Sequence, residues 1–218
     1  VVNSYTTDLW IEPECSDVGS NWERVMNSRA SNRYYVRGSP GSELIDAPSD
    51  AADDLIRISF TVTEEGAYKI WGRLVTSGMD ANSFWVKMDT LEWTLWEEIP
   101  VGSDWYWDDV HAGDKSSPMV YELDSGEHML QICYREYGAL LDKILITNRG
   151  ITPIGLGGAS EGCSVVGLGP EWEERELRIY PNPSGGSFHV DWGQAFSRLE
   201  IFTLDGKTVL TRTYTSPT

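Results

Sequence analysis

The chain has 218 residues, of which 34 are acidic and 17 are basic, so its formal net charge is −17. This excess of negative charge argues strongly against nucleic-acid binding, because phosphates must be met by Lys and Arg. The hydrophobic fraction of 40% is sufficient for a packed core. No apolar run approaches the roughly 20 residues of a membrane-spanning helix, so we expect no membrane insertion.

The charge is distributed unevenly along the chain. From Glu176 onward, four basic and four acidic residues cancel, so the whole excess precedes this position. Such different parts predict two domains. Residues 150–169 are rich in Gly and almost uncharged, which is typical of a linker or of a strap lying on the surface. We assign residues 1–149 to a first domain, 150–175 to a linker and 176–218 to a smaller second domain.

Helical periodicity is nearly absent, and short runs of β-branched and aromatic residues alternate with polar ones between Gly, Ser and Asp turns. In the first domain, these runs predict strands at 54–62, 67–75, 83–89, 119–123, 128–134 and 140–147. Strands at this spacing without crossover helices are typical of a jelly-roll β-sandwich. In the second domain, four short runs and a hairpin signal at Asp205-Gly206 predict a small, incomplete Ig-like β domain. The fold class is therefore all-β.

Ten tryptophans are the most unusual feature of the composition, and six of them fall between residues 71 and 107. Indole faces left at a surface stack on the apolar faces of sugar rings, which favours carbohydrate binding. The alternative is that four or five of these rings belong to the core. Alternation in Ser83–Asp89 places Trp85 opposite the core face, available to a ligand or to a covering loop. Trp105 and Trp107 alternate around Tyr106 and form a candidate stacking platform.

Three segments together resemble the jelly-roll carbohydrate-binding modules related to families six and thirty-five. They are residues 10–22 (WIEPECSDVGSNW), 82–107 (NSFWVKMDTLEWTLWEEIPVGSDWYW) and 134–148 (YREYGALLDKILITN). Such modules occur attached to bacterial polysaccharide-degrading enzymes. The resemblance covers about residues 8–148. It implies a noncatalytic module, excised from a larger glycoside hydrolase or polysaccharide lyase, that targets a secreted enzyme to its polysaccharide.

In the resembling modules, loops at one end of the sandwich form the sugar site. Arg135-Glu136 lies between two strong predicted strands, so we expect this pair near a hairpin tip, where it can bind vicinal hydroxyls. We expect Arg73 and Asn82, at the ends of adjacent strands, to reach the same rim. The predicted carbohydrate contacts are Arg73, Asn82, Trp85, Trp105, Trp107, Arg135 and Glu136. The alternative for Arg135-Glu136 is a surface ion pair.

A metal site is suggested by Glu12 and Glu14, which flank Pro13. Two residues apart on a strand, they point to one face and repel each other unless a cation lies between them. In the resembling modules, these carboxylates and an Asp at the start of the last strand, here Asp142, hold a structural calcium ion. Oxygen ligands suit Ca²⁺. The alternative is an exposed carboxylate pair, with Asp142 salt-bridged to Lys143 or a nearby Arg.

The chain contains three cysteines, Cys15, Cys133 and Cys163. Their spacing alone fits either one disulfide with a spare thiol in an extracellular setting or three buried, reduced thiols. In the resembling fold, the first and penultimate strands are neighbours. The resemblance therefore implies a disulfide between Cys15 and Cys133, with Cys163 unpaired.

A second resemblance covers Ile179–Tyr214, which contains a YPNP turn, an aromatic-Val strand and a DGK hairpin in that order. This segment is similar to the C-terminal sorting domain recognised by the type IX secretion system of Bacteroidetes-type bacteria. It implies an interaction with the secretion machinery and a location at the cell surface or in the medium. The last third of that domain is missing, so we expect that the chain stops early.

Two other classes of function compete with glycan binding. Catalysis is not expected, because adjacent carboxylates such as Glu97-Glu98, Asp108-Asp109 and Asp53-Asp54 point to opposite sides of a strand rather than across a cleft. Common catalytic motifs are also absent from the sequence. A structural or adhesin module would instead bury its tryptophans against another chain. The acidic surface disfavours an anionic glycan, although Arg37, Arg73 and Arg135 could provide a local exception.

Overall fold

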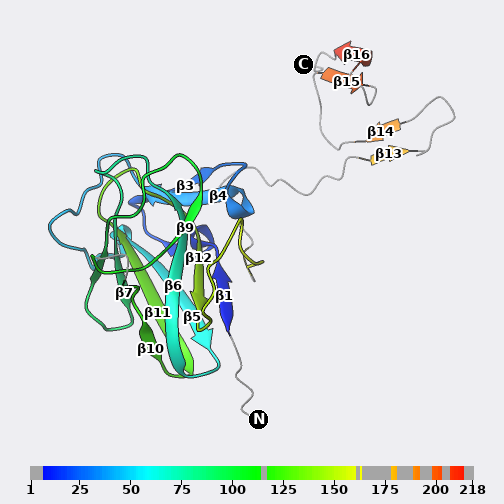
Figure 1. Ribbon diagram of the computed structural model, residues 1–218. Coiled ribbons are helices and arrows are strands. Elements are labelled where there is room, and N and C mark those ends of the chain that lie inside the picture. The colour runs from blue at the N-terminus through cyan, green and yellow to red at the C-terminus, as the bar shows by residue number, and fades with distance from the viewer. Residues whose placement is uncertain are drawn as a thin grey trace, which may run out of the picture. The chain divides into compact units, whose positions relative to one another are not determined.

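The computed structural model describes residues 7–113, 117–160 and 163, and four strand segments, 178–180, 189–191, 198–202 and 207–213. The chain divides into two compact units, Val1–Val165 and Val166–Thr218. Figure 1 shows the strands of both units. Among the described residues, no helix is long and apolar enough to cross a membrane.

The first unit consists of two antiparallel sheets. One contains β1 (Asp8–Ile11), β3 (Trp22–Met26), β4 (Tyr34–Gly38), β6 (Gly66–Val75), β9 (Tyr106–Asp109), β10 (Tyr121–Leu123) and β12 (Leu140–Thr147). These seven strands follow the order β10-β6-β12-β4-β3, with β1 paired to β12 and β9 paired to β6. The other sheet contains β2 (Asp17–Val18), β5 (Leu55–Val62), β7 (Phe84–Met88), β8 (Thr94–Trp96) and β11 (Gly126–Tyr134), in the order β2-β5-β11-β7-β8.

The inner faces of the two sheets form one apolar core. Phe84, Val86 and Met88 alternate inward along β7 and are each 1% exposed, while Ile144 and Ile146 alternate inward along β12. Burial of such side chains stabilises the sandwich by roughly 25 cal/mol for each Å² removed from water. The predicted all-β jelly-roll sandwich is confirmed, and the predicted core face of β7 is the observed one.

One predicted connection is wrong. The segment after β11 was expected to turn a hairpin into β12, but β11 pairs with β5 and β7 whereas β12 pairs with β1, β4 and β6. Residues 135–139 therefore cross from one sheet to the other. Two long apolar runs separated by five residues are compatible with either connection, because each sheet presents one face to the same core.

Residues 150–160 and Cys163, called the strap below, lie on the first unit rather than leading away from it. The backbone carbonyl of Gly155 accepts hydrogen bonds from Arg73 Nε at 2.9 Å and Trp107 Nε1 at 3.1 Å. Ser160 Oγ donates to Glu12 Oε1 at 2.9 Å. These contacts hold residues 155–160 against the first unit, as in the strap interpretation, while the division of the chain into domains and a linker stays a prediction.

The second unit contains two antiparallel strand pairs. β13 (Arg178–Tyr180) pairs with β14 (His189–Asp191), and β15 (Arg198–Phe202) pairs with β16 (Thr208–Thr213). The four strands predicted from the sequence are therefore present. The predicted turns at 181–186 and 205–206 lie outside the described residues.

Candidate functional site

One end of the sandwich, called the loop end below, is built from segments 39–54, 76–83, 97–105 and 135–139, which follow β4, β6, β8 and β11. The strand register places these four strand ends together, because Leu140 pairs with both Val75 and Arg37, and Phe84 pairs with both Tyr134 and Trp96. Each segment is a connection between strands, and such connections carry binding residues on a rigid scaffold.

Trp85 lies on the outer side of β7 and is half-buried. Its indole Nε1 donates to the carbonyl oxygen of Leu44 at 2.9 Å, and the Leu44 N–H donates to the carbonyl oxygen of Arg135 at 2.8 Å. Segment 39–54 therefore acts as the covering loop that was one of the two expectations for this ring.

Arg135 and Glu136 form a hydrogen-bonded network with Ser83. Arg135 Nη1 donates to Glu136 Oε1 at 2.6 Å and to Ser83 Oγ at 3.1 Å, while Ser83 Oγ donates to Glu136 Oε2 at 2.5 Å. Burial raises the pKa of Glu136, against the opposing effects of Ser83 and Arg135. Asn82 is buried beside this network and donates to the carbonyl oxygen of Ile99 at 3.2 Å. The alternative of an Arg-Glu ion pair is confirmed, but the pair lies largely buried.

The loop end also exposes large apolar side chains. Each of its four segments contributes one, and their exposed fractions are 47% for Ile45, 78% for Met79, 45% for Val101 and 39% for Tyr137. The guanidinium carbon of Arg37 lies 5.6 Å from the centroid of the Tyr137 ring. Apolar groups gathered at one end of a folded domain mark a candidate interaction surface.

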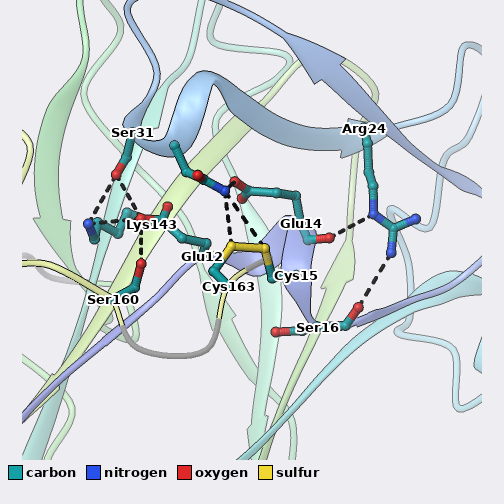
Figure 2. Close-up of a disulfide and its surroundings, with 10 residues drawn as sticks. Glu12, Glu14, Cys15, Ser16, Arg24, Ser31, Lys143, Ser160 and Cys163 are labelled. Atoms are coloured by element: carbon teal, nitrogen blue, oxygen red, sulfur yellow. Dashed lines mark hydrogen bonds and ion pairs between the residues drawn. A yellow bond between two sulfur atoms is a disulfide. The ribbon is translucent and has the colours of Figure 1, made fainter. Parts of the chain in front are cut away.

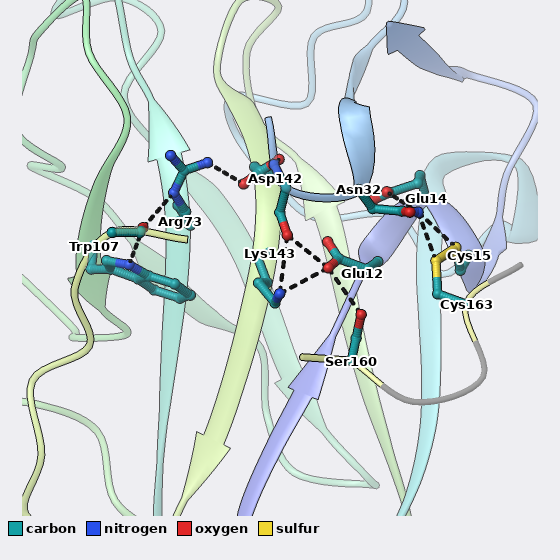
Figure 3. Close-up of polar contacts among 12 residues, drawn as sticks. Glu12, Glu14, Cys15, Asn32, Arg73, Trp107, Asp142, Lys143, Ser160 and Cys163 are labelled. Atoms are coloured by element: carbon teal, nitrogen blue, oxygen red, sulfur yellow. Dashed lines mark hydrogen bonds and ion pairs between the residues drawn. A yellow bond between two sulfur atoms is a disulfide. The ribbon is translucent and has the colours of Figure 1, made fainter. Parts of the chain in front are cut away.

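Arg73, Trp105 and Trp107 form a second cluster on the outer face of the seven-stranded sheet. The Arg73 guanidinium is 6% exposed, lies 5.2 Å from the Trp105 ring centroid and pairs with Asp142 Oδ2 at 2.5 Å. Figure 3 shows Arg73 between Asp142 and Trp107. Trp107 also contacts the Trp10 ring edge-on, with ring centroids 5.7 Å apart.

The seven predicted carbohydrate contacts therefore divide into two groups with separate partners. Arg73 was expected at the end of its strand, but it pairs with Trp107 and Lys143 inside β6. Its side chain consequently faces the strap rather than the loop end. The predicted strand 67–75 ends at the observed Val75 and places Arg73 two residues before that end, and its alternation with the core residue Leu74 puts Arg73 on the outer face of the sheet.

The predicted metal ligands Glu12 and Glu14 are 3% and 2% exposed. They do not share a strand, because β1 ends at Ile11 and Pro13–Cys15 forms a 3-10 turn. Figure 2 shows both carboxylates beside this turn. Glu12 Oε1 accepts hydrogen bonds from Ser31 Oγ at 2.8 Å and Ser160 Oγ, and lies 2.9 Å from Lys143 Nζ.

Two carboxylate oxygens in this cluster, Glu12 Oε2 and Glu14 Oε2, are buried without a hydrogen-bond partner among the residues that the structure describes. Burial raises the pKa of Glu14 to about 8, and the charges of Glu12 and Asp142 act in the same direction. A buried carboxylate oxygen without a partner costs free energy, so these two atoms fit the ligand chemistry of a hard cation.

Asp142 differs from the two glutamates because both of its oxygens have partners. Oδ1 accepts the backbone N–H of Ser31 at 2.7 Å, and Oδ2 pairs with Arg73. The alternative of an Asp salt-bridged to a nearby Arg is therefore confirmed. Two groups in the described residues bring possible ligand atoms within 4.8 Å of one another, Glu14 with Cys15 and Cys163, and Asp108 with Asp109 and His111, and neither includes Glu12 or Asp142.

The predicted disulfide is wrong. Cys15 bonds to Cys163, with Cα atoms 5.5 Å apart, and Cys133 is a buried free thiol. The inference failed because β1 neighbours β12 rather than β11, so Cys133 lies in the other sheet, opposite Trp85 and Leu55. Cys163 follows β12 by sixteen residues, and only the path of the strap returns it to Cys15.

Two cavities among the described residues lie apart from both clusters of predicted sugar contacts. One of about 420 Å³ is lined by residues that include Trp10, Ser59 and Cys163, and one of about 410 Å³ by residues that include Ser59, Asp89 and His128. Neither contains a predicted sugar contact. An extended polysaccharide can bind to an open surface, so the loop end does not require an enclosed cavity.

Comparison with known proteins identifies the second unit. Residues 178–218 match the model of the secretion system C-terminal sorting domain. The C-terminal region carries a secretion sorting domain. The chain is accordingly directed to the cell surface or the extracellular space, as predicted.

Solved structures similar to the chain include three from carbohydrate-active proteins. A family 35 carbohydrate binding module from Clostridium thermocellum is 13% identical, with a TM-score of 0.47 and coverage of 63% of this chain and 96% of the module. The GH26-CBM35 β-(1,4)-mannanase of Podospora anserina is 16% identical, with a TM-score of 0.49 and coverage of 67% and 28%. The exo-β-1,3-galactanase of Phanerochaete chrysosporium is 16% identical, with a TM-score of 0.47 and coverage of 64% and 29%.

The chain thus spans less than a third of the length of these two enzymes. No curated protein gives a significant match to it.

Proposed function

We propose that the first unit is a noncatalytic carbohydrate-binding module that holds a secreted polysaccharide-degrading enzyme on its glycan. The observation that carries the proposal is the loop end, where the half-buried indole of Trp85 adjoins the Arg135-Glu136 network and the Tyr137 ring is exposed. Sugar sites combine apolar ring faces with a few fixed polar groups, and the loop end contains both.

Within this proposal, Trp85, Asn82, Arg135 and Glu136 contact the sugar or hold the groups that do, whereas the Trp105 ring lies over Arg73 in the second cluster. Arg73 and Trp107 instead support the site from the strap side, because both donate to the carbonyl oxygen of Gly155. Of the seven predicted sugar contacts, the proposal therefore keeps only those that lie on the loop end or border it.

Affinity electrophoresis of the full chain against a panel of plant and marine polysaccharides tests the proposal. At least one polysaccharide should retard the protein, and Trp85→Ala should weaken retardation by up to about tenfold, since an aromatic contact contributes roughly 0.5–1.5 kcal/mol beyond its buried area. Leu91→Ala is the matched control, because this exposed apolar residue lies in the turn between β7 and β8, away from the loop end. Failure of every polysaccharide to retard the protein would contradict the proposal.

The same proposal includes a structural calcium ion held by Glu12 and Glu14, with Asp142 nearby. The support is the pair of buried, unpartnered oxygens, whose repulsion a divalent cation would relieve. Calcium should raise the thermal unfolding midpoint after dialysis against a chelator, and Glu14→Gln should abolish that rise. An unchanged midpoint on calcium addition would contradict the calcium part of the proposal alone.

A structural or adhesin module is the second candidate, and the exposed Ile45, Met79 and Val101 favour it, because aliphatic side chains do not stack on sugars. A partner protein would bury these three side chains. Sedimentation measures the oligomeric state of the chain alone and in the presence of the retarding polysaccharide. It separates the candidates, since only a self-assembling adhesin module is expected to associate without glycan.

A further inference from the structure

We infer that the glycan bound at the loop end is a neutral polysaccharide, without uronate or sulfate groups. This inference rests on the proposed function and defines its ligand class. It follows from the charge partners of the arginines in and around the site, together with the composition of the segments that form it.

The three arginines that could have bound an anionic sugar are all paired within the protein. Arg135 Nη1 lies 2.6 Å from Glu136 Oε1, Arg73 Nη1 lies 2.5 Å from Asp142 Oδ2, and Arg37 Nη2 lies 2.9 Å from Glu23 Oε2. The Arg135 and Arg73 pairs are largely buried, with side-chain exposures of 22% and 11%, and of 8% and 0%. Each guanidinium is therefore already neutralised by a carboxylate held in place by the fold.

The other three segments of the loop end are acidic, and of their carboxylates Asp50 is paired with Lys87 and Asp104 with Arg29. Segments 39–54, 76–83 and 97–105 contain nine acidic residues and no basic one. A surface whose charges share one sign produces an electrostatic potential that extends about a Debye length, roughly 8–10 Å at physiological ionic strength. An approaching uronate or sulfate is repelled by this surface.

A sugar carboxylate at Arg135 would either displace Glu136 or add a second negative charge beside it, because Glu136 already balances the guanidinium charge. The displaced carboxylate would remain buried and unpaired beside a second negative charge, which is the costly outcome for a buried ion pair. Sugar hydroxyls have no such conflict. A hydroxyl can accept from a free guanidinium N–H and donate to a carboxylate lone pair, so an intact Arg-Glu pair offers both kinds of contact to neighbouring hydroxyls.

The test compares neutral polysaccharides with acidic ones of matched backbone, using affinity electrophoresis of the full chain. Suitable pairs are galactomannan with polymannuronate, and arabinoxylan with glucuronoxylan. A neutral polymer should retard the protein at least about tenfold more strongly than its acidic counterpart. That retardation should be unchanged between about 0.05 and 0.5 M NaCl, because no ion pair with the ligand is formed.

Retardation by an acidic polymer that weakens as salt increases would overturn the inference while leaving glycan binding intact. No retardation by any polymer would instead contradict the proposed function. The two failures are therefore distinguishable in one set of gels.

Glu136→Gln should free Arg135 and produce salt-sensitive retardation by polymannuronate that the wild-type chain lacks. Glu23→Gln should likewise free Arg37 from its carboxylate partner. The Glu23 side chain is 37% exposed, so this variant repeats the test without disturbing a buried group. If both variants fold and neither gains affinity for the acidic polymer, the pairing argument is wrong.

Discussion

The strap side and the loop end contain the same kinds of residue but differ in which of them are covered by a neighbouring segment. Both place tryptophan near an arginine that is paired with a carboxylate. Under the strap, Arg73 and Trp107 donate hydrogen bonds to the backbone carbonyl oxygen of Gly155, and Trp10 packs against Trp107. At the loop end, Trp85 likewise donates to a backbone carbonyl, that of Leu44, but the neighbouring Tyr137 ring remains exposed. Residue type alone therefore does not define a binding site, because the segment that covers a ring decides its role.

The largest expected effect separates a buried ion pair from an exposed one. Asp142→Ala leaves Arg73 buried without its counter-ion and should lower the free energy of unfolding by about 3–5 kcal/mol. Asp104→Ala breaks the exposed pair with Arg29, in which the arginine side chain is 66% exposed. This variant should change the free energy of unfolding by less than about 1 kcal/mol. Urea unfolding of both variants measures the difference, and equal effects would contradict the structural role of the Arg73 pair.

The disulfide should stabilise the strap side and leave the loop end unaffected. It joins residues 148 positions apart, so Cys15→Ser should cost about 2–5 kcal/mol of stability. Cys133→Ala, which removes the buried free thiol, is the control and should cost less.

Alkylation of the unfolded, unreduced protein provides a direct check on the disulfide. The label should appear on Cys133 only, and labelling of Cys163 would show that the disulfide is not formed.

A smaller effect is expected from the packing of the strap on Trp10. A Cβ atom at Gly158 would lie 2.4 Å from Trp10 Nε1, whereas one at Gly150 would meet nothing within 4 Å. Gly158→Ala should therefore lower stability by about 1–3 kcal/mol, because the ring or the strap must move. Gly150→Ala should be nearly neutral. Glycan retardation should survive in both variants, and its loss in Gly158→Ala would indicate that the strap belongs to the sugar site.

The smallest effect concerns a histidine outside both regions. His128 Nδ1 lies 2.8 Å from Asp89 Oδ2, and Nε2 lies 2.8 Å from the carbonyl oxygen of Asp124. Burial lowers the pKa of His128, but the hydrogen bond to Asp89 and the other interactions outweigh burial and raise it above 6.5. The folded state therefore holds the proton more tightly than the unfolded state.

This contribution to stability is fully present below pH 6.5 and is lost as the pH rises through the folded-state pKa. Urea midpoints measured from pH 5 to pH 9 should fall over that range, and the fall should be shallower in Asp89→Asn. The same slope in variant and wild type would contradict the assignment.

The sequence predicted the fold well, because alternation along strands such as β5 and β7 directly reports which face is buried. It failed where chain path rather than alternation decides the outcome. The hairpin expected around Arg135 is a crossover between sheets, and the Cys15 partner follows from the strap, which carries no periodic signal.

The site was predicted only in part for the same reason. Glu12 and Glu14 do lie in one cluster, although the turn at Pro13 and not a strand face brings them there. Arg73 was misplaced although its predicted strand ends at the observed Val75, because its alternation with the core residue Leu74, which puts it on the outer sheet face, was not applied. Its pairing with Asp142 could be anticipated only as one alternative among several.

Hydrogen exchange of the full chain, with and without an oligosaccharide from the retarding polysaccharide, tests the central claim most directly. We expect new protection from amide hydrogen exchange in segments 39–54, 76–83 and 135–139, with no change in residues 150–160. Protection confined to the strap, or to the sheet face beneath it, would contradict a sugar site at the loop end.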